Sequence, residues 1–323
     1  MQKFSRNELE EIYQKFIHWK PVSLIISFSK RLVLPGFDGM PFYDVSLFFF
    51  KGMLKGSITQ RASSLSFNFF LALFPAIIFF FTLIPYFPIS NFQSTLFEIL
   101  QSFLPSSAFE TVKSTISDII TNKRSGLLSI GFIMTLYFAT NGVSAIMDAF
   151  NQTYHTLETR SWIKQRFISI FLVIILSVLL IISISLITIG SFVLNYLVDY
   201  GILKGQLTIY LLFVSRWIVL LAMLFFGVSF LYYYAPAKKK TFRFISAGST
   251  LATFLTLVST LGFKYYVANF SKYNALYGSI GTLIIILMWI YFNAIILLIG
   301  FELNASISKA KKDGKKIKEL KFL

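Results

Sequence analysis

The stretch "YNALYGSIGTLIIILMWIYFNAIILLIGFELNA", residues 273–305, decides the fold class of this chain. It carries no charged side chain between Lys272 and Glu302. An α-helix rises 1.5 Å per residue, so about 20 residues cross a hydrocarbon core roughly 30 Å thick. The stretch is therefore long enough to span a membrane, and we place the span over 281–301. A buried helix of a large soluble protein is the alternative, and the rest of the chain decides between them.

Uncharged stretches of this length recur along the chain. Hydrophobic residues make up 56% of the 323 residues and charged residues only 14%, against about 25% in soluble domains. Lipid offers no hydrogen-bond partner to an exposed backbone, so spanning segments of this kind are helices. We therefore predict an all-α integral membrane protein with six transmembrane helices. The six stretches without Asp, Glu, Lys or Arg are 62–97, 125–147, 167–198, 217–237, 244–263 and 273–301.

The positive charges predict the orientation. Lys and Arg number twenty-three in residues 1–63, the second and fourth connections and the C-terminal tail, against six in the alternate connections. Loops rich in Lys and Arg stay in the cytoplasm. We therefore expect both termini in the cytoplasm and the protein in a bacterial cytoplasmic (inner) membrane. This topology, with attraction to anionic lipid, also explains the net charge of +16.

Three regions follow from this pattern. Residues 1–60 are expected to be cytoplasmic or interfacial, 61–305 to form the six-helix transmembrane domain, and 306–323 to be a Lys-rich cytoplasmic tail. Residues 3–20 are charged throughout, so we expect no cleavable signal. The helices are expected at about 64–87, 127–147, 167–198, 209–234, 244–267 and 280–304.

Two further segments are predicted to be amphipathic. The stretch "DVSLFFFKGMLKG" (44–56) places Lys51 and Lys55 one turn apart, which is typical of a helix in the headgroup plane. A helix that binds a soluble partner is the alternative. In the long outer connection 88–126, apolar residues repeat at helical spacing, which predicts two helices over the outer face.

The sequence shows no apparatus for enzymatic chemistry. There is no cysteine, and His18 and His155 have no second ligand at metal spacing. No GxxxxGK[ST] motif appears, so ATP is not bound by that route. We predict no enzyme activity, no cofactor and no metal site. No soluble domain offers a basic face with base-stacking aromatics, so we expect no nucleic-acid partner.

Charged residues within or beside the spans are costly and therefore informative. Arg216 lies about two turns into the fourth helix. It either snorkels to the outer headgroups or faces the bundle and binds an anionic group. Glu302 ends the sixth helix, where it is either an ordinary interfacial acid, the interpretation that we favour, or an inward-facing proton or cation relay.

Neutral polar residues and kinks form the second group of candidates. Asn68, Asn141, Asn195 and Asn293 either join neighbouring helices by hydrogen bonds or line a substrate path. Pro75 removes one backbone hydrogen bond in mid-span, which favours a kink.

The aromatic pair Trp289 and Tyr291 falls near mid-membrane. We expect both to face the bundle with their polar atoms paired with groups such as Asn293. The glycines Gly278, Gly281 and Gly300 permit tight turns or close helix approach.

Polar residues at the end of the second helix form another group. Asp148 and Asn151 lie beside Arg160 and Arg166, which is consistent with a cytoplasmic ion-pair cluster.

Four stretches carry a resemblance to a known family. They are "RASSLSFNFFLALFPAII" (61–78), "NGVSAIMDAFNQTYHTLETRSWIKQRF" (141–167), "LYYYAPAKKKTFRFISAGSTLAT" (231–253) and "YVANFSKYNALYGSIGTLIIILMWIYFNAIILLIGFELNA" (266–305). Together they resemble the YihY/BrkB family of bacterial inner-membrane proteins, once labelled ribonuclease BN. The matching residues include Asn151, Tyr154, Arg160, Pro236, Tyr273, Asn274, Tyr277, Gly278, Gly281, Trp289, Tyr291, Gly300 and Glu302.

The resemblance covers roughly 56–305 and implies six helices, but no settled activity. RNA hydrolysis by a metal-dependent nuclease needs clustered carboxylates and histidines, which makes the ribonuclease label a poor fit. Our first hypothesis is an ATP-independent transporter, exporter or lipid-handling protein for an amphipathic or anionic substrate. Its partners would be membrane lipids and an anionic lipid-like or small molecule, and a homo-oligomer is possible. The alternative is a non-transporting scaffold of the cell envelope.

Overall fold

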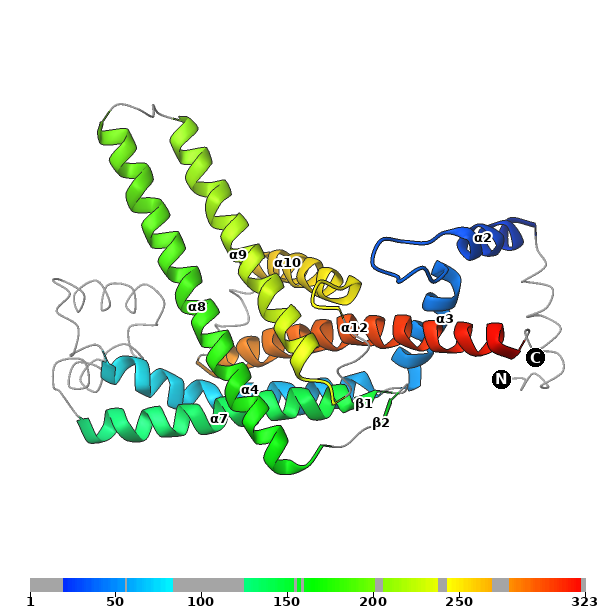
Figure 1. Cartoon of the computed structure of the whole chain (residues 1–323). Helices are drawn as coiled ribbons and strands as arrows, with labels where there is room; N and C mark the ends of the chain where they lie inside the picture. Colours follow the sequence, from blue (N-terminus) through cyan, green and yellow to red (C-terminus); the bar gives the residue numbers. More distant parts are fainter. Residues whose placement is uncertain are drawn as a thin grey trace.

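The computed structural model of the chain describes residues 20–55, 57–83, 125–153, 156–157, 160–200, 206–237, 243–268 and 279–320. The regular secondary structure of the described part is helical apart from one pair of two-residue strands, which agrees with the predicted all-α class. Figure 1 shows the arrangement of these elements. In chain order they are α2 (Lys20–Arg31), α3 (Phe42–Lys55), α4 (Ile58–Leu83), α7 (Ser125–Asn151), β1 (Gln152–Thr153), β2 (Thr156–Leu157), α8 (Trp162–Asp199), α9 (Gln206–Tyr234), α10 (Ala247–Ala268) and α12 (Ser279–Leu320).

The six long helices α4, α7, α8, α9, α10 and α12 correspond to the six predicted ones. Most of their ends lie within a few residues of the prediction, and α4 continues through Pro75. The last helix is longer than predicted, because α12 runs from Ser279 to Leu320, past the expected helix end at about 304. Lys and Arg are good helix formers, so the Lys-rich tail extends the helix. The two predicted outer helices, and Tyr154, Tyr273, Asn274, Tyr277 and Gly278, lie outside the described residues.

Five of the described helices are long and apolar enough to cross a membrane by length and composition: α4, α7, α8, α9 and α12. The exception among the six is α10, because its 22 residues include six Ser and Thr side chains. Several of these hydroxyls donate to the carbonyl four residues earlier, as Thr253 does to Ser249 at 2.8 Å and Thr260 to Thr256 at 2.7 Å. Such hydroxyls are satisfied within the helix, which lowers their cost in lipid.

The helix ends that belong to the predicted cytoplasmic side meet at one end of the bundle. There α4 begins beside the end of α7, α8 begins beside α7, and α9 ends beside α12. In Figure 1, α4, α7 and α12 run alongside one another, while α8 and α9 cross them steeply. The main hydrophobic core lies at this shared end, where Phe150 of α7 stacks on Phe301 of α12 with ring centroids 4.0 Å apart.

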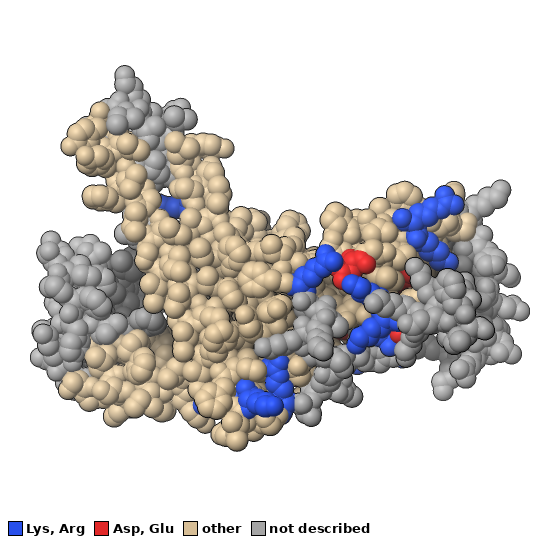
Figure 2. Space-filling view, viewed as in Figure 1, with Lys and Arg blue, Asp and Glu red and all other residues tan. Residues whose placement is uncertain are grey.

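The charged side chains are concentrated in one part of the molecule. In Figure 2, Lys and Arg gather on the side of this face that holds α2, α3 and the end of α12, with a second group at the lower middle. Most of the remaining described surface on this face is uncharged, and many large apolar side chains are exposed along α7, α8 and α9. An exposed apolar surface of this extent is expected where helices face hydrocarbon rather than water.

Two glycines allow α10 and α12 to cross closely. A Cβ atom on Gly248 would overlap the Gly300 carbonyl oxygen and the Asn304 side chain. A Cβ on Gly300 would lie 2.6 Å from the Gly248 carbonyl oxygen. The Asn304 Oδ1 accepts a hydrogen bond from the Gly248 amide at 2.9 Å. The expected close approach at Gly300 is thus confirmed, while Gly281 is simply buried in the first turns of α12.

Candidate functional site

A polar cleft of about 1060 Å³ lies between the start of α4 and the end of α7. This volume lies at the upper end of the usual range for ligand sites, roughly 300–1,000 Å³. Two of the predicted site residues, Asn68 and Asn141, line it from facing helices. Its described lining is Lys55, Ser57, Gln60, Arg61, Ser64, Asn68, Asn141, Ser144, Ala145, Asp148, Ala149, Gln152 and Thr153.

The cleft extends from the charged end into the depth of the bundle. From Ser57 to Asn68, α4 rises about 16 Å at 1.5 Å per residue, roughly half of a 30 Å hydrocarbon core. Serines, amides and charged groups on this path could not be satisfied by lipid tails. The cleft is therefore suited to hold water or a polar ligand at membrane depth.

Arg61 and Glu302 form a buried pair beside the cleft. Arg61 is 8% exposed and Glu302 is fully buried, with Arg61 Nη2 3.8 Å from Glu302 Oε2. Arg61 Nη1 donates a hydrogen bond of 2.7 Å to the Ala149 carbonyl. One guanidinium thus joins α4 to α7 and to α12. Our favoured interpretation of Glu302 as an ordinary interfacial acid was wrong, because the carboxylate faces the bundle interior.

Gly52 of α3 makes room for that carboxylate. A Cβ atom there would overlap Glu302 Oε1 and Cδ. The close contact places α3 across α12 at the level of the buried pair. The predicted amphipathic helix is therefore formed, with Val45 and Gly52 buried and Phe50 and Leu54 exposed.

A polar seam between α7 and α8 fixes the far wall of the cleft. Arg166 Nη1 donates to the Asn141 Oδ1 at 2.6 Å, and Gln165 Nε2 donates to the Asp148 Oδ1 at 2.7 Å. Ser144 and Ser169 share a hydrogen bond of 2.8 Å. The hydrogen bond from Arg166 therefore makes Asn141 a link between α7 and α8. Asn141 also lines the cleft, and its role on a substrate path stays a prediction.

The predicted ion-pair cluster at the end of α7 is a hydrogen-bonded cluster instead. Arg160 donates to the carbonyls of Tyr234 and Pro236, and the Asn151 side chain accepts from the Ala237 amide at 2.9 Å. Burial lowers the pKa of Arg160 from its ordinary value. These side chains satisfy carbonyl and amide groups where α9 ends, so Asn151, Arg160 and Pro236 stabilise the connection that follows.

The other predicted site residues lie apart from the cleft. Arg216 is exposed on α9 and is not among the described residues that line the cleft. Trp289 is 40% exposed, contrary to the bundle-facing expectation, while Tyr291 packs partly against the core. Asn293 Nδ2 donates a hydrogen bond of 2.8 Å to the Trp289 carbonyl, which belongs to the same helix.

Sequence reasoning missed Arg61, although a signal was present. Arg61 begins one span and Glu302 ends another, and both ends were assigned to the same membrane face. Opposite charges at the same depth on neighbouring helices are candidates for a pair. Among the described residues no group of three or more His, Asp or Glu side chains has the arrangement of a metal site.

This fold and site define a multi-pass helical membrane protein with a polar cleft at one end. Comparison with known proteins gives the family. The family model described as "Virulence factor BrkB" matches residues 49–321, and the chain belongs to this family. This match extends through most of the Lys-rich tail, whereas the resemblance seen in the sequence covered only roughly 56–305.

Two relatives from bacteria agree with this assignment. The chain is 34% identical over 253 residues to the "Putative ribonuclease-like protein YfkH" of Bacillus subtilis, covering 78% of this chain and 91% of that protein. It is 26% identical over 274 residues to a "UPF0761 membrane protein" of Psychromonas ingrahamii, covering 84% and 89%. No solved structure matches the chain.

Proposed function

We propose that this protein crosses the bacterial inner membrane six times, with both termini in the cytoplasm, and moves or handles an anionic amphipathic molecule without hydrolysing ATP. The observation that carries the proposal is the cleft between α4 and α7. It brings hydrogen-bonding side chains from the charged end to about half the depth of the bundle. A molecule with a polar headgroup and an apolar remainder would place the headgroup there.

The charges in the cleft favour an anion. Its described lining holds two cations, Lys55 and Arg61, and one carboxylate, Asp148. Glu302 lies behind Arg61 and holds the guanidinium in place. Arg61 Nε and Nη2 are buried and its Nη1 is bonded to the Ala149 carbonyl, so a phosphate or carboxylate headgroup would meet the exposed side chain of Lys55 rather than a pair of Arg61 donors.

Asn68 and Asn293 provide a matched pair of variants. Each amide donates to the carbonyl four residues earlier in its own helix, at 2.9 Å and 2.8 Å. Only Asn68 lines the cleft. We expect Asn68→Ala to slow movement of the substrate about five- to tenfold, the effect of one lost hydrogen bond of ~1–1.5 kcal/mol, and Asn293→Ala to leave it unchanged.

The measurement is flux in liposomes that contain the purified protein. Fluorescent anionic phospholipids and small organic anions would be followed across the bilayer for wild type, both asparagine variants and Arg216→Ala. Arg216 lies outside the cleft, so its variant should resemble wild type. Background flux for every substrate with wild-type protein would remove the proposal.

The second candidate function is a scaffold for other envelope proteins. It is supported by a separate small core at the charged end, where Phe37 and Val45 pack with Ile307 and Ala310. An ordered assembly of this kind offers a surface for a protein partner. Background flux together with a stoichiometric partner in mild-detergent purification would favour this function. The absence of enzyme activity stays a prediction, with metal-dependent RNA cleavage as its test.

A further inference from the structure

A second pocket is separate from the cleft, and the two share no described lining residue. It has a volume of about 710 Å³ and lies between α3, the loop before it and the start of α10. Its wall is mainly aromatic and aliphatic, with Phe37, Phe42, Phe49, Leu251, Phe254 and Leu303 among its lining residues. The function proposed above makes no use of this pocket.

Apart from Ser46, the polar side chains of the described wall already have hydrogen-bond partners within the protein. The Thr250 hydroxyl donates to the Ser246 carbonyl at 3.1 Å. The Ser246 hydroxyl is hydrogen-bonded to Ser249 at 3.1 Å and accepts from the Asn304 amide at 2.9 Å. The pocket therefore presents methyl and aromatic surface, which suits a ligand with no polar groups along its length.

The outer edge of the pocket is also apolar. Phe50 is 61% exposed, Ile245 66% and Phe254 59%. All three line the pocket while presenting most of their surface outward. In a membrane protein such an edge is continuous with the lipid-facing surface of α10, so an acyl chain can enter from the side.

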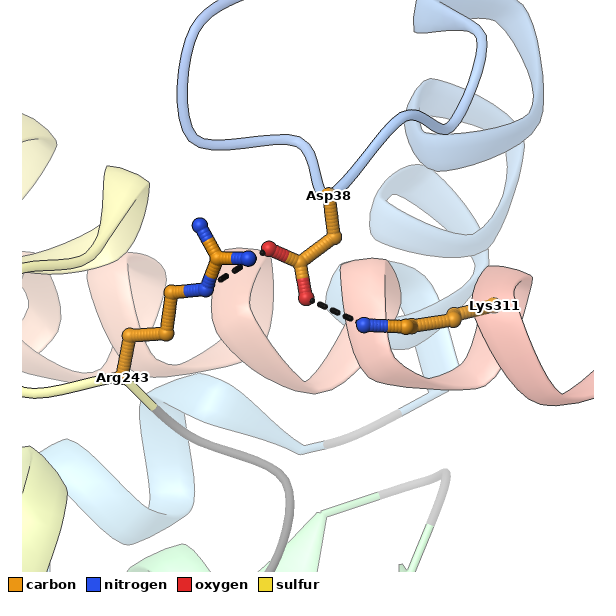
Figure 3. A network of polar contacts seen from close by, with 3 residues as sticks. All are labelled: Asp38, Arg243 and Lys311. Carbon is orange, nitrogen blue, oxygen red and sulfur yellow. Dashed lines mark hydrogen bonds and ion pairs between the residues drawn. The ribbon is translucent and has the colours of Figure 1, made fainter.

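A cationic network lies beside the pocket residue Phe37, and Figure 3 shows its members, Asp38 between Arg243 and Lys311. Asp38, next to the pocket residue Phe37, accepts from Lys311 Nζ at 2.8 Å and pairs with Arg243 Nε at 3.1 Å. Arg243 is 70% exposed at its side chain. Two cations against one carboxylate leave a positive excess at the boundary of the pocket, which would attract a lipid phosphate.

We propose that this pocket holds an acyl chain of a resident anionic phospholipid, with its phosphate beside Arg243. This lipid joins α3, α10 and α12 and is distinct from the molecule in the α4–α7 cleft. The inference does not depend on transport, because a resident lipid would serve a scaffold equally well. The wall chemistry, the open apolar edge and the cationic boundary point to the same occupant.

Photocrosslinking from two positions on α10 tests the occupant. Benzoylphenylalanine would replace Phe254, which lines the pocket, or Val258, which is 49% exposed on the same helix and is not among the described lining residues. Both variants would be irradiated in membranes and again after extensive detergent exchange. Mass spectrometry would identify the attached molecule. We expect phospholipid adducts at both positions in membranes, and at position 254 alone after exchange.

A filling substitution provides the second arm. Thr250→Trp should abolish the retained adduct at position 254, with Leu261→Trp, on an exposed part of α10, as its control. Arg243→Gln should lower retention of anionic phospholipid several-fold. Equal loss of the adducts at 254 and 258 on detergent exchange would overturn the inference. So would attachment at 254 to another part of this chain or to a second copy.

Discussion

Arg61 and Glu302 face one another where α3, α4 and α12 meet. Taking two charges out of water is costly, and their attraction offsets that cost only while both are present. Arg61 also makes a second interaction, in which its Nη1 donates a hydrogen bond to the Ala149 carbonyl at the end of α7. Arg61 and Glu302 therefore fix the relative position of α4, α7 and α12 beside the cleft.

Removing one partner of this pair should destabilise the protein strongly. We expect Arg61→Met to cost about 3–5 kcal/mol of stability, since it leaves a buried carboxylate without its cation. The double variant Arg61→Met with Glu302→Leu should regain most of that loss. Recovery stays incomplete by ~1 kcal/mol, because the Ala149 carbonyl loses its donor.

The measurement is unfolding in detergent for the two single variants and the double variant. Lys312→Met, at an exposed position on the same α12, is the control for loss of a positive charge. Additive effects of the two substitutions would show that the pair is not coupled and would contradict this account.

At the scale of elements, α10 shows how backbone contact replaces side-chain packing. Six of its 22 residues are Ser or Thr, and among the six long helices that the structure describes it alone lacks a stretch long and apolar enough to span a membrane. Gly248 brings it against Gly300 of α12, and Asn304 binds the Gly248 amide. Small residues that allow helix backbones to approach are a common means of association in membranes.

Gly248→Ala should separate these two helices. The added Cβ would meet the Gly300 carbonyl, which is backbone and cannot move aside easily. We expect a loss of several kcal/mol or failure to assemble, seen as a lower melting temperature and aggregation in size-exclusion chromatography. Gly262→Ala on the same helix, where nothing lies within 4 Å of the new Cβ, should be neutral or slightly stabilising. Equal stability of the Gly248→Ala and Gly262→Ala variants would contradict the close contact between α10 and α12 at Gly248.

At the scale of the whole molecule, the sequence predicted the helices better than the site. Uncharged stretches mark where hydrocarbon surrounds the chain, so six long helices could be placed from charge spacing alone. The length of α12 was missed because a Lys-rich segment is compatible with both a helix and an unstructured tail. Asn68 and Asn141 were singled out together, since polar groups at membrane depth are few.

The sequence places Arg61 and Glu302 at the same predicted membrane face, but it does not show that their two helices are neighbours. Arg216 looked more important than Arg61 because it lies inside an apolar span, whereas Arg61 lies at a boundary where charge is ordinary. Only the packing of α4 against α12 places Arg61 beside Glu302. The apolar pocket likewise depends on how the loop before α3 folds over α10, which no periodicity reveals.

The proposed topology predicts the position of both chain ends. Reporter fusions that are active only in the cytoplasm should be active at residue 1 and at residue 323. A fusion within the connection after α8 should be active only as a periplasmic reporter. Opposite locations for the two ends would contradict an even number of spans.

The most direct test of the central claim uses the fact that the chain contains no cysteine. Single cysteines would be placed at Ser64, which lines the cleft, and at Phe67, which is 59% exposed on the same helix. Maleimides react with the thiolate, which forms in water but not in hydrocarbon. With a membrane-impermeant maleimide, we predict that Ser64→Cys reacts in inside-out vesicles and not in intact cells, while Phe67→Cys reacts in neither. An unreactive Ser64→Cys, or one labelled from outside, would contradict a water-filled cleft open to the cytoplasm.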